Sequence, residues 1–330
     1  MTKLIAELCQ NHNGSQEVLI GMVEAAADAG ADYAKVQSIF ADDLTPRGRF
    51  ETGEEEQNGV VKTIHRPFRP EYNRLAELEL TEADHRVFIE TCADHGITPI
   101  TTVFARKRIP MIASLPWPER TVKVASYDCA SVPMLRELAE SFDHLIVSTG
   151  ATYDEEIETV AQVLSDLDVE YTFLHCVTNY PNELSTCNLS RMDWLRQFTD
   201  EVGWSDHTLV ERDGVIAAKA AIALGAEWVE RHFTVLDAAE TKDGPVSITP
   251  PLLRELDEFA ALSDAEKWRL VEAELETKGL EMRALVGNRE REMTHEEVLN
   301  RDYYRGRFAS YDPVRKLWVY NWEDEIMGDE

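Results

Sequence analysis

Short apolar segments alternate with amphipathic segments along most of the chain. The amphipathic segments have helical periodicity and include residues 17–29, 81–95, 153–167 and 212–224. The apolar segments predict eight buried strands, at residues 3–8, 33–37, 98–102, 121–125, 144–148, 171–176, 202–205 and 228–232. Eight strand–helix units without low-complexity sequence predict an α/β fold, a closed (β/α)8 TIM barrel, with an open doubly wound sheet as the alternative.

Local signals at the ends of the predicted helices support this reading. Thr81 with Asp84, and Thr152 with Glu155, have the spacing of a capping box at a helix start. A glycine follows several predicted helices and precedes a strand, as expected at a left-handed C-cap. These glycines are Gly30, Gly96 and Gly225.

We expect residues 1–287 to form the catalytic barrel and residues 288–330 to form a C-terminal extension that is not a separate domain. The connection over residues 38–80 is too long for an ordinary loop between a strand and the next helix. Its charge, prolines and glycines predict a long β2–α2 loop that covers the active site. The acidic run at residues 51–56 is interpreted as a solvated loop tip.

Polar residues lie at or just beyond the ends of the predicted strands. Active sites of barrels of this type gather at the C-terminal ends of the strands. Structural residues would be divided between the two barrel faces, so this clustering favours one shared site. The residues are Glu7, Lys35, Gln37, Thr101, Thr102, Lys123, Ser126, Ser148, His175, Thr178, Ser205, His207 and His232.

Two histidines close neighbouring apolar segments, in Trp204-Ser205-Asp206-His207 and in Glu230-Arg231-His232. Imidazole is a common ligand for divalent metals, so His207 and His232 are the predicted metal site. A single histidine on an apolar strand is more often a core residue. The two histidines alone are therefore a weak signal, and the motifs that surround them strengthen the assignment.

Charge and composition limit the partners of this protein. The net charge of −29 and the pI near 4.6 argue against nucleic acid and anionic membranes as partners. No long apolar run or signal-peptide pattern is present, and we expect a soluble, cytoplasmic protein. The five cysteines form no CxxC pair, which fits reduced thiols. An anionic substrate would need a locally positive pocket, to which Lys35 and Lys123 could contribute.

Several motifs together carry a resemblance to a known family. In order along residues 1–262, they are Ala6-Glu7-Leu8-Cys9-Gln10-Asn11-His12-Asn13-Gly14, Lys35-Val36-Gln37, Lys123-Val124-Ala125-Ser126, Val147-Ser148-Thr149-Gly150, His175-Cys176 with Tyr180-Pro181, and the two histidine motifs. The chain resembles the sialic acid synthase family. That resemblance implies the condensation of phosphoenolpyruvate with an N-acetylmannosamine-type amino sugar, which yields a nine-carbon 2-keto acid and phosphate.

The resemblance also implies roles for individual residues. The phosphoenolpyruvate contacts match Lys35, Lys123, Ser126, Ser148 and Ser205. It implies that His207 and His232 hold a divalent metal, with Mn2+ favoured and Mg2+ or Co2+ as substitutes. The expected catalytic residues are Glu7, Lys123, Asp128, His207 and His232, and the other expected substrate contacts are Gln37, Thr102, Thr178, Asn179, Tyr180 and Asp243.

The chain departs from the family pattern in two places. Ser126-Tyr127-Asp128 stands where the family commonly has Ser-Gly-Glu, so the carboxylate is one methylene shorter and lies beside a bulky ring. Thr178 stands where Asn or Ser is frequent, and Asn179 could compensate. These changes indicate a different sugar or a different placement of the same sugar.

Two other classes of function use strand-end lysines and histidines. One is a metal-dependent barrel lyase or epimerase acting on a sugar phosphate, with a variant in which Lys123 forms a Schiff base. The other is a non-catalytic barrel that serves as a binding or assembly subunit. The retained lysines and histidines argue against the latter.

Many relatives in this family carry a C-terminal antifreeze-like domain whose arginine crosses a homodimer to reach the sugar's acyl group, and a homodimer is expected here as well. The extension after residue 287 is too short for that domain, but it contains Arg301, Arg305 and Arg307 among aromatic residues. We expect it to pack over a barrel mouth. One of these arginines would then replace the contact to the substrate.

Overall fold

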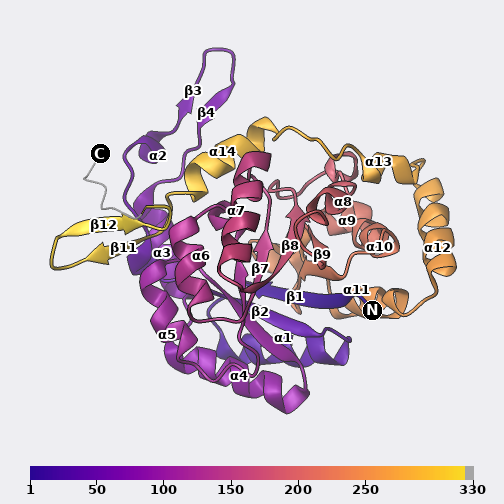
Figure 1. The fold of residues 1–330 in the computed structure, drawn as a ribbon, viewed down its shortest axis with the longest axis horizontal. Helices are drawn as coiled ribbons and strands as arrows, with labels where there is room; N and C mark the ends of the chain where they lie inside the picture. Colours follow the sequence, from indigo (N-terminus) through magenta and orange to yellow (C-terminus); the bar gives the residue numbers. More distant parts are fainter. Residues whose placement is uncertain (324–330) are drawn as a thin grey trace.

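Eight parallel strands close into a barrel in the computed structural model, which describes residues 1–323 (Figure 1). β1 pairs with β10 to close the ring, in register from Lys3 with Trp228 to Glu7 with His232. The predicted TIM barrel is therefore confirmed. In barrel order the strands are β1 (Lys3–Cys9), β2 (Tyr33–Ser38), β5 (Thr98–Val103), β6 (Thr121–Val124), β7 (His144–Ser148), β8 (Glu170–Cys176), β9 (Val202–Asp206) and β10 (Trp228–His232).

Helices surround this barrel on the outside (Figure 1). Those in the first half of the barrel are α1 (Gln16–Asp28), α4 (Glu82–His95), α5 (Ile109–Ala113), α6 (Val132–Ala139) and α7 (Asp154–Asp166). The later ones are α8 (Arg191–Leu195), α9 (Val210–Asp213), α10 (Ile216–Ala223), α11 (Pro250–Ala260), α12 (Asp264–Thr277) and α13 (Met282–Val286). Within the described residues, no helix is long and apolar enough to cross a membrane.

The helix-end predictions were mostly confirmed. Thr81 and Asp84 form the capping box of α4, and Gly30, Gly96 and Gly225 have positive φ angles. Two details were wrong. α7 begins one residue later than expected, with Tyr153 donating its N–H to Glu156, and the helix expected at residues 212–224 is interrupted at Gly214.

Two layers of apolar residues stabilise the barrel. Strand residues that face the helices form the larger cluster with α1, α4, α6, α7, α10 and α11. A small cluster fills the barrel interior and consists of Ile5, Tyr33, Ile100, Ile146, Leu174 and Trp228. Gly203 is required beside this cluster, because a Cβ there would lie 2.1 Å from the carbonyl oxygen of Trp228. The filled interior closes the barrel below the strand ends.

The connection after β2 contains η1 (Ala41–Asp43), α2 (Arg49–Thr52), β3 (Glu54–Glu55), β4 (Val61–Thr63) and α3 (Phe68–Leu78). The β3–β4 hairpin projects from the molecule (Figure 1), and its acidic residues are exposed, as expected of a solvated loop tip.

The chain after α13 returns across the barrel as α14 (His295–Tyr304), followed by the hairpin of β11 (Ala309–Asp312) and β12 (Leu317–Tyr320). Phe308 packs with Ile39, Leu44 and Leu75 in a separate apolar cluster, and it forms an isolated bridge with Leu44. The extension therefore docks on the long connection of its own barrel, at the end where the strands terminate.

Candidate active site

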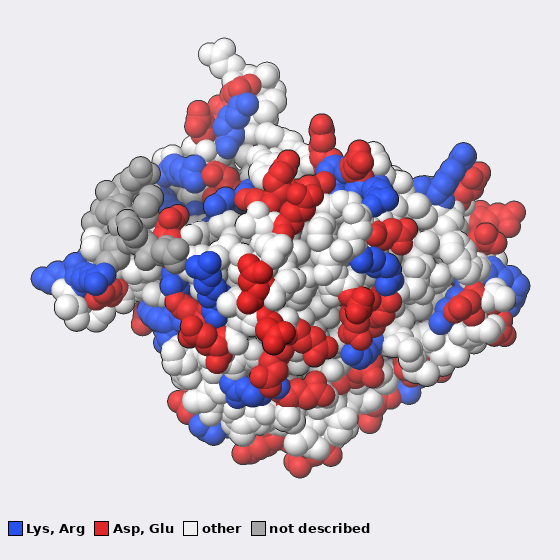
Figure 2. Space-filling view, viewed as in Figure 1, with Lys and Arg blue, Asp and Glu red and all other residues white. Residues whose placement is uncertain are grey.

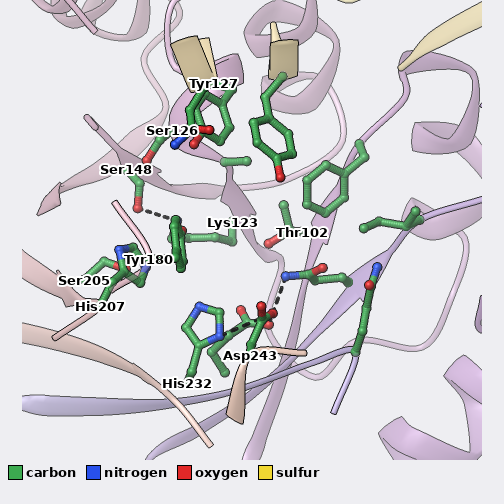
Figure 3. Close-up of a pocket in the computed structure, with 18 of the residues that line it drawn as sticks. Thr102, Lys123, Ser126, Tyr127, Ser148, Tyr180, Ser205, His207, His232 and Asp243 are labelled. Atoms are coloured by element: carbon green, nitrogen blue, oxygen red, sulfur yellow. Dashed lines mark hydrogen bonds and ion pairs between the residues drawn. The ribbon is translucent and has the colours of Figure 1, made fainter. Parts of the chain in front are cut away.

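A cavity of about 350 Å³ opens at the C-terminal ends of the barrel strands. This volume lies within the range of small-molecule sites. The cavity brings together twelve of the expected site residues, most of which Figure 3 labels: Glu7, Lys35, Gln37, Thr102, Lys123, Ser126, Ser148, Tyr180, Ser205, His207, His232 and Asp243.

An alternating cluster of ammonium and carboxylate groups forms the floor of the cavity. Lys35 contacts Glu7, and its Nζ lies 3.7 Å from Oε2 of Glu230 and donates a 3.1 Å hydrogen bond to Thr102. Nζ of Lys123 lies 3.9 Å from the same oxygen of Glu230. All four charged side chains are buried, so each ammonium depends on these carboxylates for compensation.

The hydroxyl groups of the site are bonded to this charged floor. Lys123 donates a 2.6 Å hydrogen bond to Ser148, and Ser205 donates a 2.9 Å hydrogen bond to Glu230. Burial acts to raise the pKa of Glu230, but Lys123, Lys35 and the Ser205 hydroxyl outweigh it and lower this pKa to about 2. Glu230 is therefore a fixed anion that holds both lysines at the strand ends.

His207 and His232 lie close together in the cavity, with ring centroids 5.4 Å apart (Figure 3). Nδ1 of His207 donates a 2.9 Å hydrogen bond to the carbonyl of Val177, because a carbonyl can only accept, and this leaves Nε2 available. Nδ1 of His232 is buried without a hydrogen bond and lies 3.8 Å from Asp243.

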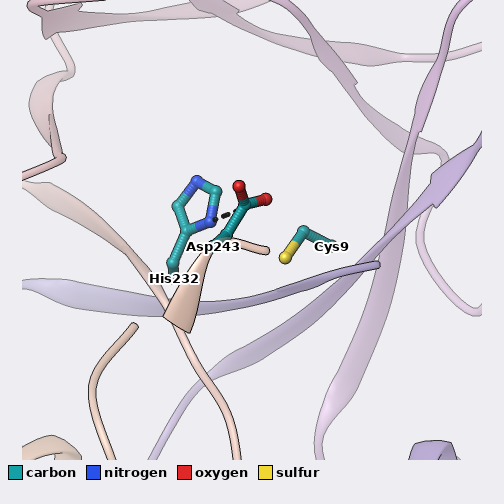
Figure 4. Close-up of side chains that lie close together, drawn as sticks. All are labelled: Cys9, His232 and Asp243. Carbon is teal, nitrogen blue, oxygen red and sulfur yellow. Dashed lines mark ion pairs between the residues drawn. The ribbon is translucent and has the colours of Figure 1, made fainter. Parts of the chain in front are cut away.

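The residues around His232 fit a metal ion. Ligand atoms of His232, Asp243 and Cys9 lie within 4.8 Å of one another (Figure 4), and the unpaired imidazole nitrogen is a donor without a protein partner. Imidazole and carboxylate together suit several divalent metals. Cys9 and Asp243 were not expected as ligands, and they add donors beside the predicted pair.

Comparisons with known proteins agree with this geometry. The model of the NeuB family matches residues 22–267. The chain belongs to the NeuB family. It is similar to the pseudaminic acid synthase of Campylobacter jejuni, with 27% identity over 97% of this chain and 85% of that protein. It is also similar to the N,N'-diacetyllegionaminic acid synthase of Legionella pneumophila, with 32% identity over 80% of this chain and 72% of that one.

Among solved structures, the chain is similar to the N-acetylneuraminic acid synthetase of Leptospira borgpetersenii. The TM-score is 0.66 and the identity 24%, over 92% of this chain and 90% of that one. This likeness supports the barrel fold. The family resemblance expected from the sequence motifs is confirmed by the family match.

The structure does not bring three expected site residues of this NeuB-family chain to the cavity. Asp128 is buried against the extension, where Asn321 donates a 3.1 Å hydrogen bond to it. The backbone N–H of Thr178 donates to Glu297, and Asn179 accepts a hydrogen bond from Thr294. None of the three is among the described residues that line the cavity, so their expected contact with the substrate stays a prediction.

The cavity also contains residues for which sequence reasoning assigned no role. Glu230 is the central one, and its signal was available, because in a strand it shares a face with His232 two residues later. Arg66 and Arg74 come from the long connection, and Lys242 precedes Asp243. Nothing in the local sequence marks these three.

The long connection after β2 and the C-terminal extension, which were both expected to cover the active site, contribute residues to the cavity. The long connection supplies Ile39, Arg66 and Arg74, and the extension supplies Glu296, Asn300, Tyr304 and Arg307. Of the three candidate arginines, Arg307 lines the cavity, whereas Arg301 pairs with Glu156 and Arg305 lies 3.6 Å from the ring centroid of Trp322. The extension thus covers its own barrel mouth.

The charge of the cavity differs from that of the surface. Acidic side chains are spread over the face shown in Figure 2, in keeping with the net charge of −29. Among the described residues that line the cavity, six are lysine or arginine and four are aspartate or glutamate. The locally positive pocket that an anionic substrate requires is present.

Proposed function

We propose that this NeuB-family chain condenses phosphoenolpyruvate with an N-acetylmannosamine-type amino sugar, releasing phosphate and forming a nonulosonic 2-keto acid. The observation that carries the proposal is the pair of buried lysines joined through Glu230, in the same cavity as two adjacent histidines. The names of the relatives from Campylobacter and Legionella support the same class of product.

The lysines and serines provide the site for phosphoenolpyruvate. Lys35 and Lys123 supply positive charge, and Ser126, Ser148 and Ser205 supply hydroxyl groups around them. Hydrogen bonds between an ammonium and a phosphate or carboxylate are about twice as strong as neutral ones. The cluster would fix the enol so that its nucleophilic carbon faces the histidines.

The sugar would occupy the side of the cavity that holds His232 and Asp243. A divalent ion held by His207 and His232, for which Mn2+ is the preferred candidate, would polarise the aldehyde oxygen of the open-chain sugar. Asp243 would accept hydrogen bonds from sugar hydroxyls. Gln37, which donates a 3.4 Å hydrogen bond to Glu7, would orient that carboxylate beside the sugar.

The reaction then requires one carbon–carbon bond and one water molecule. The enol carbon attacks the aldehyde carbon, whose oxygen takes up a proton and becomes a hydroxyl. Water adds to the resulting oxocarbenium-like carbon and loses one proton, and the new hydroxyl loses its proton to form the ketone as phosphate leaves from that carbon. Glu7 would accept the proton of the attacking water, since it is a buried carboxylate next to Lys35. The lysines and serines would retain the departing phosphate.

The alternative of a Schiff-base or metal-dependent lyase or epimerase has less support. A Schiff base requires a lysine nitrogen that is free to attack a carbonyl, but Nζ of Lys123 donates to Ser148 and to the carbonyl of Val124, and it lies near Glu230. These contacts already occupy the nitrogen. The cytoplasmic location and the homodimer stay predictions.

The deciding experiment is phosphate release from phosphoenolpyruvate in the presence of a panel of amino sugars. Release that requires both an N-acylated hexosamine and phosphoenolpyruvate, with a nine-carbon 2-keto acid detected by mass spectrometry, would support the proposal. Release without the sugar would contradict it. Borohydride trapping of a substrate on Lys123 would favour the aldolase instead.

A further inference from the structure

Four cationic side chains converge at the mouth of the cavity, away from the lysine floor. Arg66 and Arg74 come from the connection after β2, Lys242 from the loop after β10 and Arg307 from the extension. We call them the rim cluster. They come from three segments that are distant in sequence, so the cluster is a product of the fold and of the docked extension.

One buried carboxylate partly balances the rim cluster. Glu71 contacts Arg307 and lies 2.9 Å from Arg74. Burial acts to raise the pKa of Glu71, but the two guanidinium groups outweigh burial and lower this pKa to about 2. Asp243 and Glu296 also line this part of the cavity, so the four cations outnumber the nearby carboxylates by one. Docking of the extension brings Arg307 to Glu71 and Tyr304 to Arg66, but among the described residues it gives no partner to Lys242.

Donor groups in the cluster remain without partners. The side chain of Arg307 is only 6% exposed, and its buried Nε has no hydrogen bond. Within residues 1–323 we find no hydrogen bond or ion pair to the side chain of Lys242. The ammonium group of Lys242, which lines the cavity, is therefore available to an anion that enters it.

An aromatic ring fixes two of the cations. Arg66 donates a 2.6 Å hydrogen bond to the hydroxyl of Tyr304, and the guanidinium groups of Arg66 and Arg307 lie 5.5 and 5.2 Å from the centroid of that ring. Tyr304 in turn stacks on Tyr127 at 4.5 Å. The two guanidinium groups are held in place before any ligand arrives.

The rim cluster lies on the sugar side of the cavity. Lys242 directly precedes Asp243, the carboxylate beside His232, and Arg74 donates a 2.7 Å hydrogen bond to Gln10, which follows Cys9. The lysine floor with Ser126 and Ser148 already provides the phosphoenolpyruvate site. The rim cluster would therefore meet a group at the far end of the acceptor sugar.

We propose that the rim cluster of Arg66, Arg74, Lys242 and Arg307 binds a phosphate monoester on the terminal carbon of the acceptor, so that the substrate is a hexosamine phosphate. This inference rests on the proposed condensation and specifies its substrate. A phosphate monoester carries a charge of about −1.5 to −2 at neutral pH and offers three acceptor oxygens. Its three oxygens can accept hydrogen bonds from several of the four cations at once, whereas a carboxylate has two oxygens and one charge and a hydroxyl has no charge.

The test compares three acceptors in the presence of phosphoenolpyruvate: N-acetylmannosamine, its 6-phosphate and the corresponding 6-carboxylate. The 6-phosphate should have a kcat/KM at least about ten-fold above the other two, since one charge-assisted contact contributes about ten- to hundred-fold in binding. Equal or better turnover of the neutral sugar would overturn the inference and leave the proposed condensation intact. Preference for the carboxylate would also overturn it.

Variants of Lys242 test the assignment within the cluster. Lys242→Met should lower kcat/KM for the 6-phosphate by about ten- to hundred-fold, with a much smaller effect on the neutral sugar, and Lys242→Arg should restore most of the loss. Lys62→Met is the matched control, because Lys62 lies on the exposed β4 strand and pairs with Glu56. An equal loss for both sugars in Lys242→Met would contradict a phosphate-specific contact.

Calorimetry with the sugar phosphate alone separates this inference from the proposed function. The full chain should bind the 6-phosphate more tightly than the neutral sugar without phosphoenolpyruvate, and Lys242→Met should abolish that difference. If no sugar is turned over, the proposed condensation fails, but a binding preference for the 6-phosphate would still support the rim cluster. Equal binding of the two sugars would overturn the rim cluster assignment.

Discussion

The ammonium group of Lys123 donates a 2.6 Å hydrogen bond to the hydroxyl of Ser148 on the neighbouring strand. This contact joins β6 to β7 at the floor of the cavity and points both groups at the same space. It gives the site one cation and one hydroxyl at a fixed separation before substrate binds.

Replacement of Lys123 should selectively weaken the binding of phosphoenolpyruvate. Lys123→Met should raise the KM for phosphoenolpyruvate by about ten- to hundred-fold, because one charge-assisted contact is lost, while the KM for the sugar changes much less. Steady-state kinetics with each substrate varied in turn would measure this. Lys219→Met is the control, since Lys219 is also buried but pairs with Glu255 and Glu274 on the outer helices. An unchanged KM for phosphoenolpyruvate would rule out the role of Lys123.

Metal dependence should follow from the two histidines. Chelation should abolish turnover and added Mn2+ should restore it, and His207→Ala or His232→Ala should each lower the metal content of the purified protein. His95→Ala is the control, because His95 is a partly exposed residue at the end of α4. Full activity of both active-site variants after metal stripping would disprove the site.

The positions of the strands and of the strand-end residues could be predicted because both depend on local patterns. Glu7, Lys35, Lys123 and His232 end apolar strands, and the parallel barrel brings such ends together. The same rule could have found Glu230, which alternates with His232 along β10. For these residues the sequence alone indicates both the strand in which each residue lies and the side of that strand to which it belongs.

The placement of Asp128 could not be predicted in this way. It lies in the turn η3 (Ser126–Asp128) just after β6, but its partner Asn321 is 193 residues away. The same holds for Arg307 and Glu71, which are 236 residues apart. No periodicity or local motif reports such pairs, because they depend on where the extension docks.

Asp128 should make stability depend on pH. Burial raises its pKa to about 7 from the ordinary value of 3.8, so the folded chain retains a proton between about pH 4 and 7 that the unfolded chain releases. Stability from this group is therefore present at low pH and is lost as pH rises through 7. Asp128→Asn should reduce the difference between the urea midpoints at pH 5 and pH 8.

Asp193→Asn is the matched control for this measurement, because Asp193 is an exposed residue of α8 and its replacement removes the same charge. It should leave the difference between the two pH values close to that of the unaltered protein. If Asp128→Asn shows the same pH dependence as Asp193→Asn, the buried carboxyl does not titrate as described.

Removal of the extension should weaken the binding of the sugar and leave the binding of the metal unchanged. A chain ending at Gly287 keeps both histidines and Asp243, and it keeps the carbonyl of Val286 that accepts a hydrogen bond from Ser190. It loses the extension residues that line the cavity, which are Glu296, Asn300, Tyr304 and Arg307. The KM for the sugar should therefore rise at least about ten-fold, because at least one charge-assisted contact is lost. The metal content should be unchanged.

A longer chain ending at Ala309 separates this effect from the loss of the hairpin. It retains Phe308, which packs on the connection after β2, and all of the cavity residues, but it lacks β12 and most of β11. We expect a KM for the sugar close to that of the full chain, with circular dichroism confirming that both shortened chains fold. Unaltered sugar kinetics in the chain ending at Gly287 would show that the extension is only structural, because Arg307 could then have no part in holding the substrate.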